Sequence, residues 1–459
     1  MTPPTCSHKH PQLHVSPHAA DAGFVRPPLT KRQAATTTSG RAGNGSAVAK
    51  HSRQEHLFPG PLVLPDDGLA IDPKESPQSL RSWVNEKHRN PVTSRRKTIY
   101  VAPTPELDKA LHPTAGKWTL PSVLPAPLKG GCNPPDSEQV RQYLEAFYHP
   151  LPVKILPDEV RLVPWTEGKP TKSSKQPQYI GLQIGKDITR ITTRPCQDQA
   201  FPQQLNLNDI LDAAIESLPA DAYALVLLTN HDLYEDDDDD FCCGRAYGGS
   251  RVAVVSSARY HPLLDASASI EREHMWPASH CEAYVRRVCN DNDAQAAADP
   301  HPKRRKTAPP VGFPAKSSPA EPFAAVIAAG LAAPAPTASL TGLWLSRVAR
   351  TAAHEVGHCF CLAHCAYYAC VMQGTAGIAE DVRQPPYLCL VCLPKLMRAV
   401  GDVEKGVDGG ELVVGRYRAL AGFCAKWKRV GMFAAFGCWL ERRIEVLEGG
   451  SSAAGGMEE

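Results

Sequence analysis

The chain has 459 residues, of which 43 are proline, and a formal net charge of +2. Its length allows two or three domains, but the clustered prolines indicate that much of it lies outside a packed core. The near-neutral charge gives no general reason to expect nucleic-acid binding, and the sequence contains no apolar run of about eighteen residues that would span a membrane.

Three segments have compositions that predict disorder. Residues 1–90 are rich in Pro, Ser, Thr and basic side chains, and they begin without the apolar core of a signal peptide. Residues 291–339 are expected to be a low-complexity insertion, and residues 447–459 a flexible tail. One domain therefore remains at 91–446, interrupted by the insertion. The early histidines are interpreted as part of a solvated tail with weak metal affinity at most; they are His8, His10, His14 and His18.

The first half of the domain alternates predicted strands and helices. Apolar runs bounded by turn residues predict strands at 97–103, 152–156, 179–184 and 223–229. A helical period predicts helices at 137–148, capped by Asp136 or Ser137, and at 207–218. This alternation favours a mixed sheet covered by helices.

An acidic run and a further strand follow. Glu235–Asp240 is expected to be an exposed loop because like charges repel, although it would also suit a basic substrate or a calcium ion. The strand at 252–256 is predicted to border a cleft. Its unpaired backbone at Val252, Ala253, Val254 and Val255 would then hold an extended peptide as an added strand.

The strongest signal is a His-Glu-x-x-His motif on a helix predicted from near Ser339 or Thr341 to Phe360. His354 and His358 are four residues apart, so they share one helix face and can bind one ion. Glu355 lies about 100° around the helix, where a general base would take a proton from metal-bound water. The chain must turn back after His358 for His364 to become the third ligand, which leaves one open position.

Four cysteines directly after this motif predict a second metal site. Cys365, Cys370, Cys389 and Cys392 have the C-x4-C and C-x2-C spacing of a structural zinc site. The alternative of disulfides would require an oxidising compartment. We therefore expect two zinc ions per chain. Residues 411–446 then predict one or two amphipathic helices, with a break at Gly431.

The combined pattern HExxH-x5-H, C-x4-C-x-M and C-x2-C-x-x-K-L resembles the archaemetzincins, a branch of the metzincin metalloproteases. Segments 143–157, 223–234 and 251–260 resemble the family as well. The resemblance implies an α+β, metzincin-like zincin domain, with a twisted mixed β-sheet and helices above the cleft and a helical lower subdomain with a zinc knuckle. It also implies a Met-turn at Met372.

One residue departs from the family pattern. Metzincins usually carry glycine three residues after the second histidine, where this chain has Cys361. If the backbone keeps a positive φ there, a cysteine costs about 1–3 kcal/mol. Alternatively, Cys361 or Cys359 binds the catalytic ion and silences the site.

The sequence thus predicts a zinc metalloprotease that hydrolyses a peptide or protein substrate, with Glu355 as general base. The alternative is a catalytically silent zinc-binding interaction protein whose site is perturbed by Cys361. A nucleic-acid regulator, suggested by the knuckle and the basic patch Lys303–Lys306, is disfavoured by the net charge. We expect a monomer without membrane association, in the cytoplasm and/or nucleus.

Overall fold

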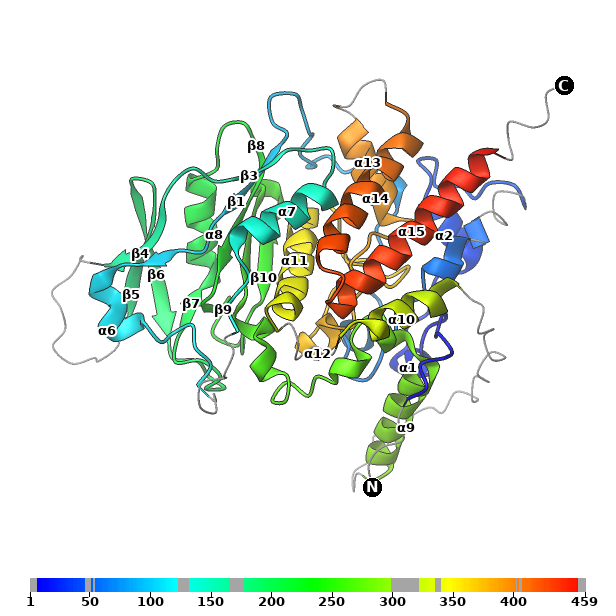
Figure 1. The fold of residues 1–459 in the computed structure, drawn as a ribbon, viewed down its shortest axis with the longest axis horizontal. Coiled ribbons are helices and arrows are strands. Elements are labelled where there is room, and N and C mark those ends of the chain that lie inside the picture. The colour runs from blue at the N-terminus through cyan, green and yellow to red at the C-terminus, as the bar shows by residue number, and fades with distance from the viewer. Residues whose placement is uncertain are drawn as a thin grey trace.

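The computed structural model describes residues 6–45, 51–52, 54–122, 132–165, 177–298, 322–334, 340–401, 403 and 407–452. Strands gather on one side of the molecule and helices on the other, with helix α11 (Leu340–Cys359) between them (Figure 1). None of the helices within these ranges has the length and apolar character needed to span a membrane.

The sheet beside α11 has the strand order β10-β11-β8-β1-β3. Neighbouring strands are parallel except β10, which is antiparallel to β11. Four of its strands confirm predicted ones: β1 (Thr98–Ala102), β3 (Val153–Ile155), β8 (Ala222–Thr229) and β11 (Val252–Ser256). Strands β1, β8 and β11 are buried along their whole length because both faces of the sheet are covered.

The place of β11 in this sheet corrects the predicted substrate strand. Residues Val252, Ala253, Val254 and Val255 pair with β8 on one side and with β10 on the other. Their backbone groups are therefore already occupied, and they cannot hold a substrate. The edge strand is instead β10 (Gly244–Tyr247), which the sequence analysis missed. A continuous apolar run is typical of a central strand, whereas β10 is short and only half-buried.

A second sheet lies beyond the first, with the order β2-β4-β5-β6-β7-β9. Only its strand at 179–184 was among the predicted strands. Helix α8 (Leu207–Glu216) lies between the sheets and contacts both β11 and β6. The strands are β2 (Glu106–Leu107), β4 (Val160–Pro164), β5 (Tyr179–Ile184), β6 (Asp187–Arg194), β7 (Gln204–Asn206) and β9 (Asp232–Tyr234).

The helical half packs against the other face of α11. Helix α7 (Ser137–Phe147) contacts α11, and a capping box of Asp136 and Gln139 begins it, as the cap prediction required. The C-terminal pair α14 (Gly409–Lys426) and α15 (Gly431–Ser452) confirms the predicted break at Gly431. Four large residues of α15 are buried against this half: Phe433, Phe436, Trp439 and Leu440. Shorter helices of this half are α12 (Ile378–Asp381) and α13 (Cys392–Gly401), whereas α6 (His112–Ala115) lies beside the second sheet (Figure 1).

The N-terminal region differs from the disordered segment expected at 1–90. Its described residues form short helices and pack on the domain. The indole of Trp83 donates to the Phe360 carbonyl (2.8 Å), and the indole of Trp439 donates to the Leu57 carbonyl (2.8 Å). Composition was misleading because a few large apolar side chains are enough to anchor a polar, proline-rich segment. Its helices are α1 (His18–Ala22), α2 (Leu29–Ala35), α4 (Gly68–Ile71) and α5 (Leu80–Val84).

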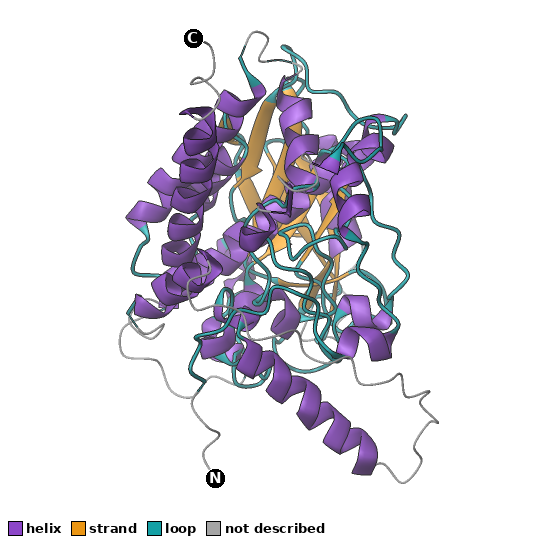
Figure 2. Cartoon of the chain, turned by 90° about the vertical axis from the view of Figure 1, so that its right-hand side faces the viewer, coloured by secondary structure: helices purple, strands orange, loops and turns teal. Residues whose placement is uncertain are grey.

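The predicted insertion and tail also contain ordered helix. Helix α9 (Glu282–Ala298) projects from the body of the molecule (Figures 1 and 2) and enters the insertion expected at 291–339. Helix α10 (Pro322–Ala332) lies within that insertion and packs on α15, and its residues Phe323, Val326 and Ile327 are fully buried. Helix α15 continues to Ser452, past the start of the tail expected at 447–459. The basic patch Lys303–Lys306 lies outside the described residues.

Candidate active site

Two histidines one turn apart on α11 present their Nε2 atoms to the same point. The Nδ1–H of His354 donates to the Val371 carbonyl (2.6 Å), and the Nδ1–H of His358 donates to the Leu362 carbonyl (2.7 Å). Each ring therefore keeps an unprotonated Nε2, and these two atoms lie 2.9 Å apart. Two facing lone pairs at this distance repel unless they share a cation, so the pair fits a metal ion.

The surroundings keep both imidazoles neutral. Burial is the main cause that lowers the pKa of His354 well below its usual value and the pKa of His358 to about 4. Neighbouring histidines lower both pKa values further. Neutral imidazole is the form that binds a metal ion.

The turn after α11 brings the third histidine back toward the helix. The helix ends at Cys359, and the Gly357 carbonyl accepts the N–H of Leu362 (3.2 Å). Cys361 has a φ of 60°, which is the left-handed conformation that favours glycine. The positive φ considered from the sequence is therefore present, with a cysteine occupying it.

The structure brings the three predicted histidines together. The ring centroid of His364 lies 5.5 Å from that of His354 and 5.1 Å from that of His358, and their ligand nitrogens lie within 4.8 Å of one another. Nδ1 of His364 is 3.4 Å from a carboxylate oxygen of Glu75. The sequence analysis missed this partner because Glu75 belongs to the region that was expected to be disordered.

Met372 lies against the helix directly beneath this group. A Cβ on Gly357 would come within 2.6 Å of the Met372 sulfur, and a Cβ on Gly374 would come within 2.7 Å of His364 Nδ1. The Cys365 N–H donates to the Met372 carbonyl (2.7 Å). Two glycines thus allow the segment around Met372 to pass close to α11 and to His364.

The four predicted cysteines also meet at one point. All are buried, and their sulfur atoms lie within 4.8 Å of one another. Cys365 and Cys389 have their sulfurs 3.6 Å apart. The sulfur contacts from Cys370, Cys389 and Cys392 lower the pKa of Cys365 well below its usual value. A closed, buried set of four sulfurs fits a tetrahedral structural zinc.

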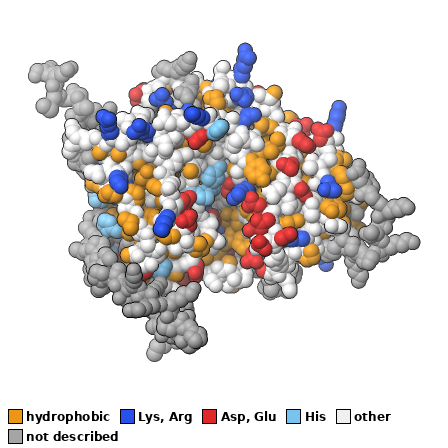
Figure 3. Space-filling view, turned by 180° about the vertical axis from the view of Figure 1, so that it is seen from behind, with side chains coloured by type: hydrophobic (Ala, Val, Ile, Leu, Met, Phe, Trp, Pro, Cys, Tyr) orange, Lys and Arg blue, Asp and Glu red, His pale blue; other side chains and the backbone are white. Residues whose placement is uncertain are grey.

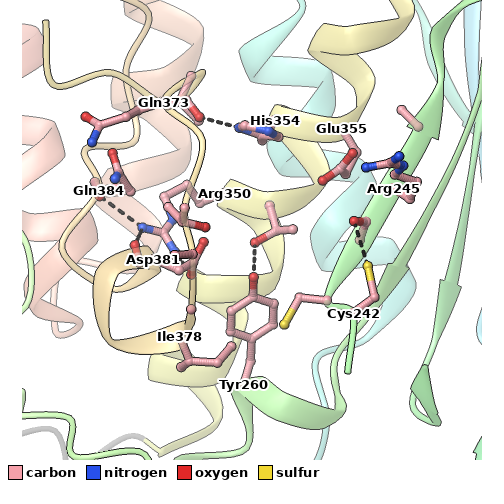
Figure 4. A pocket seen from close by; sticks show the side chains of 18 of the residues that line it. Cys242, Arg245, Tyr260, Arg350, His354, Glu355, Gln373, Ile378, Asp381 and Gln384 are labelled. Atoms are coloured by element: carbon pink, nitrogen blue, oxygen red, sulfur yellow. Dashed lines mark hydrogen bonds and ion pairs between the residues drawn. The ribbon is translucent and has the colours of Figure 1, made fainter. Parts of the chain in front are cut away.

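Glu355 points from α11 toward the edge strand. It is nearly fully buried, and burial raises its pKa to about 8, while Arg245 on β10 lowers it. Figure 4 shows the Glu355 carboxylate facing Arg245 across the pocket. A Cβ on Gly244 would lie 3.0 Å from Cγ of Glu355, so this close approach of strand and helix depends on a glycine.

A cleft of about 390 Å³ runs between β10 and α11 and includes all three histidines and Glu355. In a surface view, histidine side chains gather in a hollow near the middle of one face, with acidic side chains beside it (Figure 3). The β10 side of the cleft is formed by Cys242, Cys243, Gly244, Arg245 and Ala246. A hairpin signal was available in the sequence, because Gly248 and Gly249 separate β10 from β11.

The inner end of the cleft is polar, which the sequence analysis did not anticipate. The Arg350 guanidinium pairs with the half-buried Asp381 carboxylate and donates to the Gln384 carbonyl (3.1 Å). The Thr351 hydroxyl donates to the Tyr260 hydroxyl (2.7 Å). Figure 4 shows Tyr260 and the Arg350–Asp381 pair below His354. Burial raises the pKa of Asp381, and Arg350 opposes that shift.

Neither cysteine of the α11 turn belongs to the histidine group. Among the described residues, no cysteine sulfur joins His354, His358 and His364 within 4.8 Å. Cys359 is buried, and burial raises its pKa, so its thiol stays protonated. The acidic loop is largely exposed at Asp236, Asp237 and Asp238, and it gathers no group of metal ligands in the described structure.

Comparisons with known proteins agree with this geometry. The family model "Peptidase family M54" matches residues 334–398, which contain α11 and all four cysteines. Human archaemetzincin-2 is 25% identical over 365 residues, covering 79% of this chain and 73% of the relative. Rat archaemetzincin-1 is 25% identical over 272 residues, covering 59% and 40%.

Two solved structures are also similar to the chain. An archaemetzincin from Methanopyrus kandleri matches with 15% identity and a TM-score of 0.30, covering 67% of this chain and 97% of the other. A zinc-dependent peptidase from Methanocorpusculum labreanum matches with 17% identity and a TM-score of 0.30, covering 65% and 99%. The family model and the curated relatives together support the assignment of this chain to the archaemetzincins, a family of zinc metallopeptidases.

Proposed function

We propose that this chain hydrolyses peptide bonds in the cleft between β10 and α11, with Glu355 as the general base. The observation that carries the proposal is the convergence of three imidazoles beside a buried carboxylate and a free strand edge. His354, His358 and His364 would hold a zinc ion. When bound there, zinc polarises the scissile carbonyl and makes water easier to deprotonate.

The substrate would bind as an added strand on β10. This strand pairs with β11 on one side only, so the N–H and C=O groups of its other side are available to an extended peptide. Gly244 and Arg245 lie directly opposite Glu355, which would put the scissile bond beside the carboxylate. The preference for an extended chain over a compact small molecule follows from this edge.

Glu355 would take the proton of the attacking water and pass it to the leaving amine. Its burial favours proton uptake, because an isolated carboxylate is poorly solvated there. Arg245 favours the charged form before the reaction begins. Burial thus favours the protonated form of Glu355, and Arg245 favours the charged form. A carboxyl group under both influences can take up a proton and then release it, as the proposed role requires.

Met372 would form a Met-turn under the histidines, and the four cysteines would hold a second, structural zinc. That zinc would fix the turn that presents His364, because Cys365 follows His364 directly. The catalytically silent alternative lacks support from the site, since neither Cys361 nor Cys359 lies in the histidine group. Cys361→Gly would test it: a large gain in peptide hydrolysis would favour the silent alternative over the enzyme proposed here.

The main experiment compares the Glu355→Gln variant with the unmodified chain on a mixed peptide library. We expect a fall in kcat/KM of about 10²–10⁴-fold, because the general base is lost. Zinc content, measured by elemental analysis, should stay the same, since Glu355 is not a ligand. Glu216→Gln, on the exposed face of α8, is the control. Full activity in Glu355→Gln would refute the proposed role of Glu355.

A further inference from the structure

The N-terminal segment is held against the domain beside the start of α9. The Gln12 N–H donates to the His280 carbonyl (2.6 Å), and the Glu282 N–H donates to the His10 carbonyl (2.9 Å). Pro11 and Cys281 form an antiparallel bridge between these bonds. This pairing places the N-terminal segment beside residues that lie about 270 positions later in the sequence. It thereby brings Cys6 and His8 close to His274 and Cys281.

Three ligand atoms converge at this junction. The sulfur of Cys6 and ring nitrogens of His8 and His274 lie within 4.8 Å of one another. His8 has a φ of 50°, and its ring centroid is 5.2 Å from that of His274. No other group of described residues outside the cleft and the four-cysteine cluster combines cysteine and histidine ligands in this way.

His274 provides the independent sign of a ligand. Its side chain is only 3% exposed, and its Nδ1 contacts a carboxylate oxygen of Glu271 (2.8 Å). Its Nε2 is buried without a hydrogen-bond partner, and so is the Nε2 of His8. A buried polar atom without a partner costs about 1–3 kcal/mol. A carboxylate on Nδ1 with a free Nε2 is the usual arrangement of a metal-binding histidine.

Cys281 lies beside this group through Cys6, although its own sulfur is not among the atoms that lie within 4.8 Å of one another. Its sulfur lies 3.1 Å from that of Cys6, and the residue is 1% exposed at the start of α9. Burial is the main cause that raises its pKa to about 11, followed by its contact with Cys6. The backbone of Tyr284 and Ala283 at the helix start opposes that rise, because it favours a thiolate.

We propose that Cys6, His8 and His274 bind a zinc ion, with the Cys281 side chain turning in as the fourth ligand, and that this ion fastens the N-terminal segment to the domain. Three of the four ligands already lie close together, and with Cys281 turned inward two thiolates and two neutral imidazoles would close a tetrahedral set without a water position, so the site would be structural. Two thiolates would also neutralise the charge of the ion. The proposal is independent of peptidase activity, since none of these residues lines the catalytic cleft.

The test is the zinc content of the full chain and of single variants, purified under reducing conditions. We expect Cys6→Ser and His8→Gln each to contain one zinc ion fewer per chain than the unmodified protein. Their controls are Cys438→Ser, a half-buried cysteine on α15, and His56→Gln, an exposed histidine of the same N-terminal region. Both controls should keep the full zinc content. Equal zinc content in all five proteins would overturn the proposal.

Cobalt substitution gives a second readout that does not depend on activity. Co²⁺ bound to thiolates has a sulfur-to-metal charge-transfer band, which should fall in Cys6→Ser and stay unchanged in Cys438→Ser. Because Cys6 is only half-buried, its loss should leave the domain folded and peptide hydrolysis intact. A Cys6–Cys281 disulfide in the reduced preparation, detected by alkylation and intact mass, would also overturn the zinc site.

Discussion

The histidine group and the four-cysteine cluster are neighbours in sequence but differ in their surroundings. His364 and Cys365 are adjacent, yet the histidines are half-buried and line a cleft, whereas the four cysteines are fully buried. The difference matches their chemistry: a catalytic site needs an open position, and a structural site closes its coordination sphere with protein atoms. In the turn after α11, consecutive residues therefore belong to different groups: His364 to the histidines that line the cleft, and Cys365 to the buried cysteines.

The largest expected effect is on stability, and it separates the two groups. Cys389→Ser should lower the free energy of unfolding by several kcal/mol, because it leaves three buried sulfurs without a complete metal site. His364→Gln should change that free energy much less, since its side chain is 42% exposed, while abolishing hydrolysis. Chemical denaturation of both variants measures the contrast, and equal stabilities would break the comparison.

Chelation should distinguish the same two groups by rate. The histidine ion is open to the cleft, so a chelator should remove it first, and peptide hydrolysis should be lost in that fast phase. Release from the buried cysteines should require opening of the surrounding core and be much slower. Zinc release followed with a metal-sensitive dye, beside activity, measures both phases. Loss of activity only in the slow phase would contradict the assignment.

The edge strand offers a more local test of the open site. Gly244→Val should lower kcat/KM by about 10–100-fold, because the added side chain would press on Glu355 and cost about 1–3 kcal/mol. Gly249→Ala is a matched control in the adjoining turn, where a Cβ meets nothing within 4 Å. Steady-state kinetics with a peptide substrate measures both variants. A wild-type rate in Gly244→Val would show that β10 does not approach Glu355 in solution.

The smallest expected effect concerns the turn between the two groups. Cys361→Gly should stabilise the fold by about 1 kcal/mol, since glycine adopts a positive φ without strain. Cys438→Gly, within helix α15, should instead destabilise it by up to about 1 kcal/mol. Thermal or denaturant unfolding measures both variants. Changes of opposite sign in the free energy of unfolding would support the interpretation that Cys361 is a strained residue rather than a ligand.

Local patterns predicted the elements that hold the site. The strands β1, β3, β8 and β11 and the helices α7, α8 and α11 lie where their apolar periods indicated. Predictions from composition were less successful: the region expected to be disordered contains Trp83, which is buried under the α11 turn, and Glu75, which contacts His364. Composition averages over a segment, whereas anchoring depends on a few large residues.

Residue spacing alone indicated the three histidines proposed as ligands, because a helix places residues four apart on one face and a third histidine must then return by a turn. The tertiary structure was needed to show which strand borders the cleft, since both β10 and β11 are near in sequence and the pairing of β11 on both sides removes it from the edge. It also decided the junction of Cys6 and His8 with His274 and Cys281. Residues so distant in sequence meet only through long-range pairing, for which no local period gives a signal.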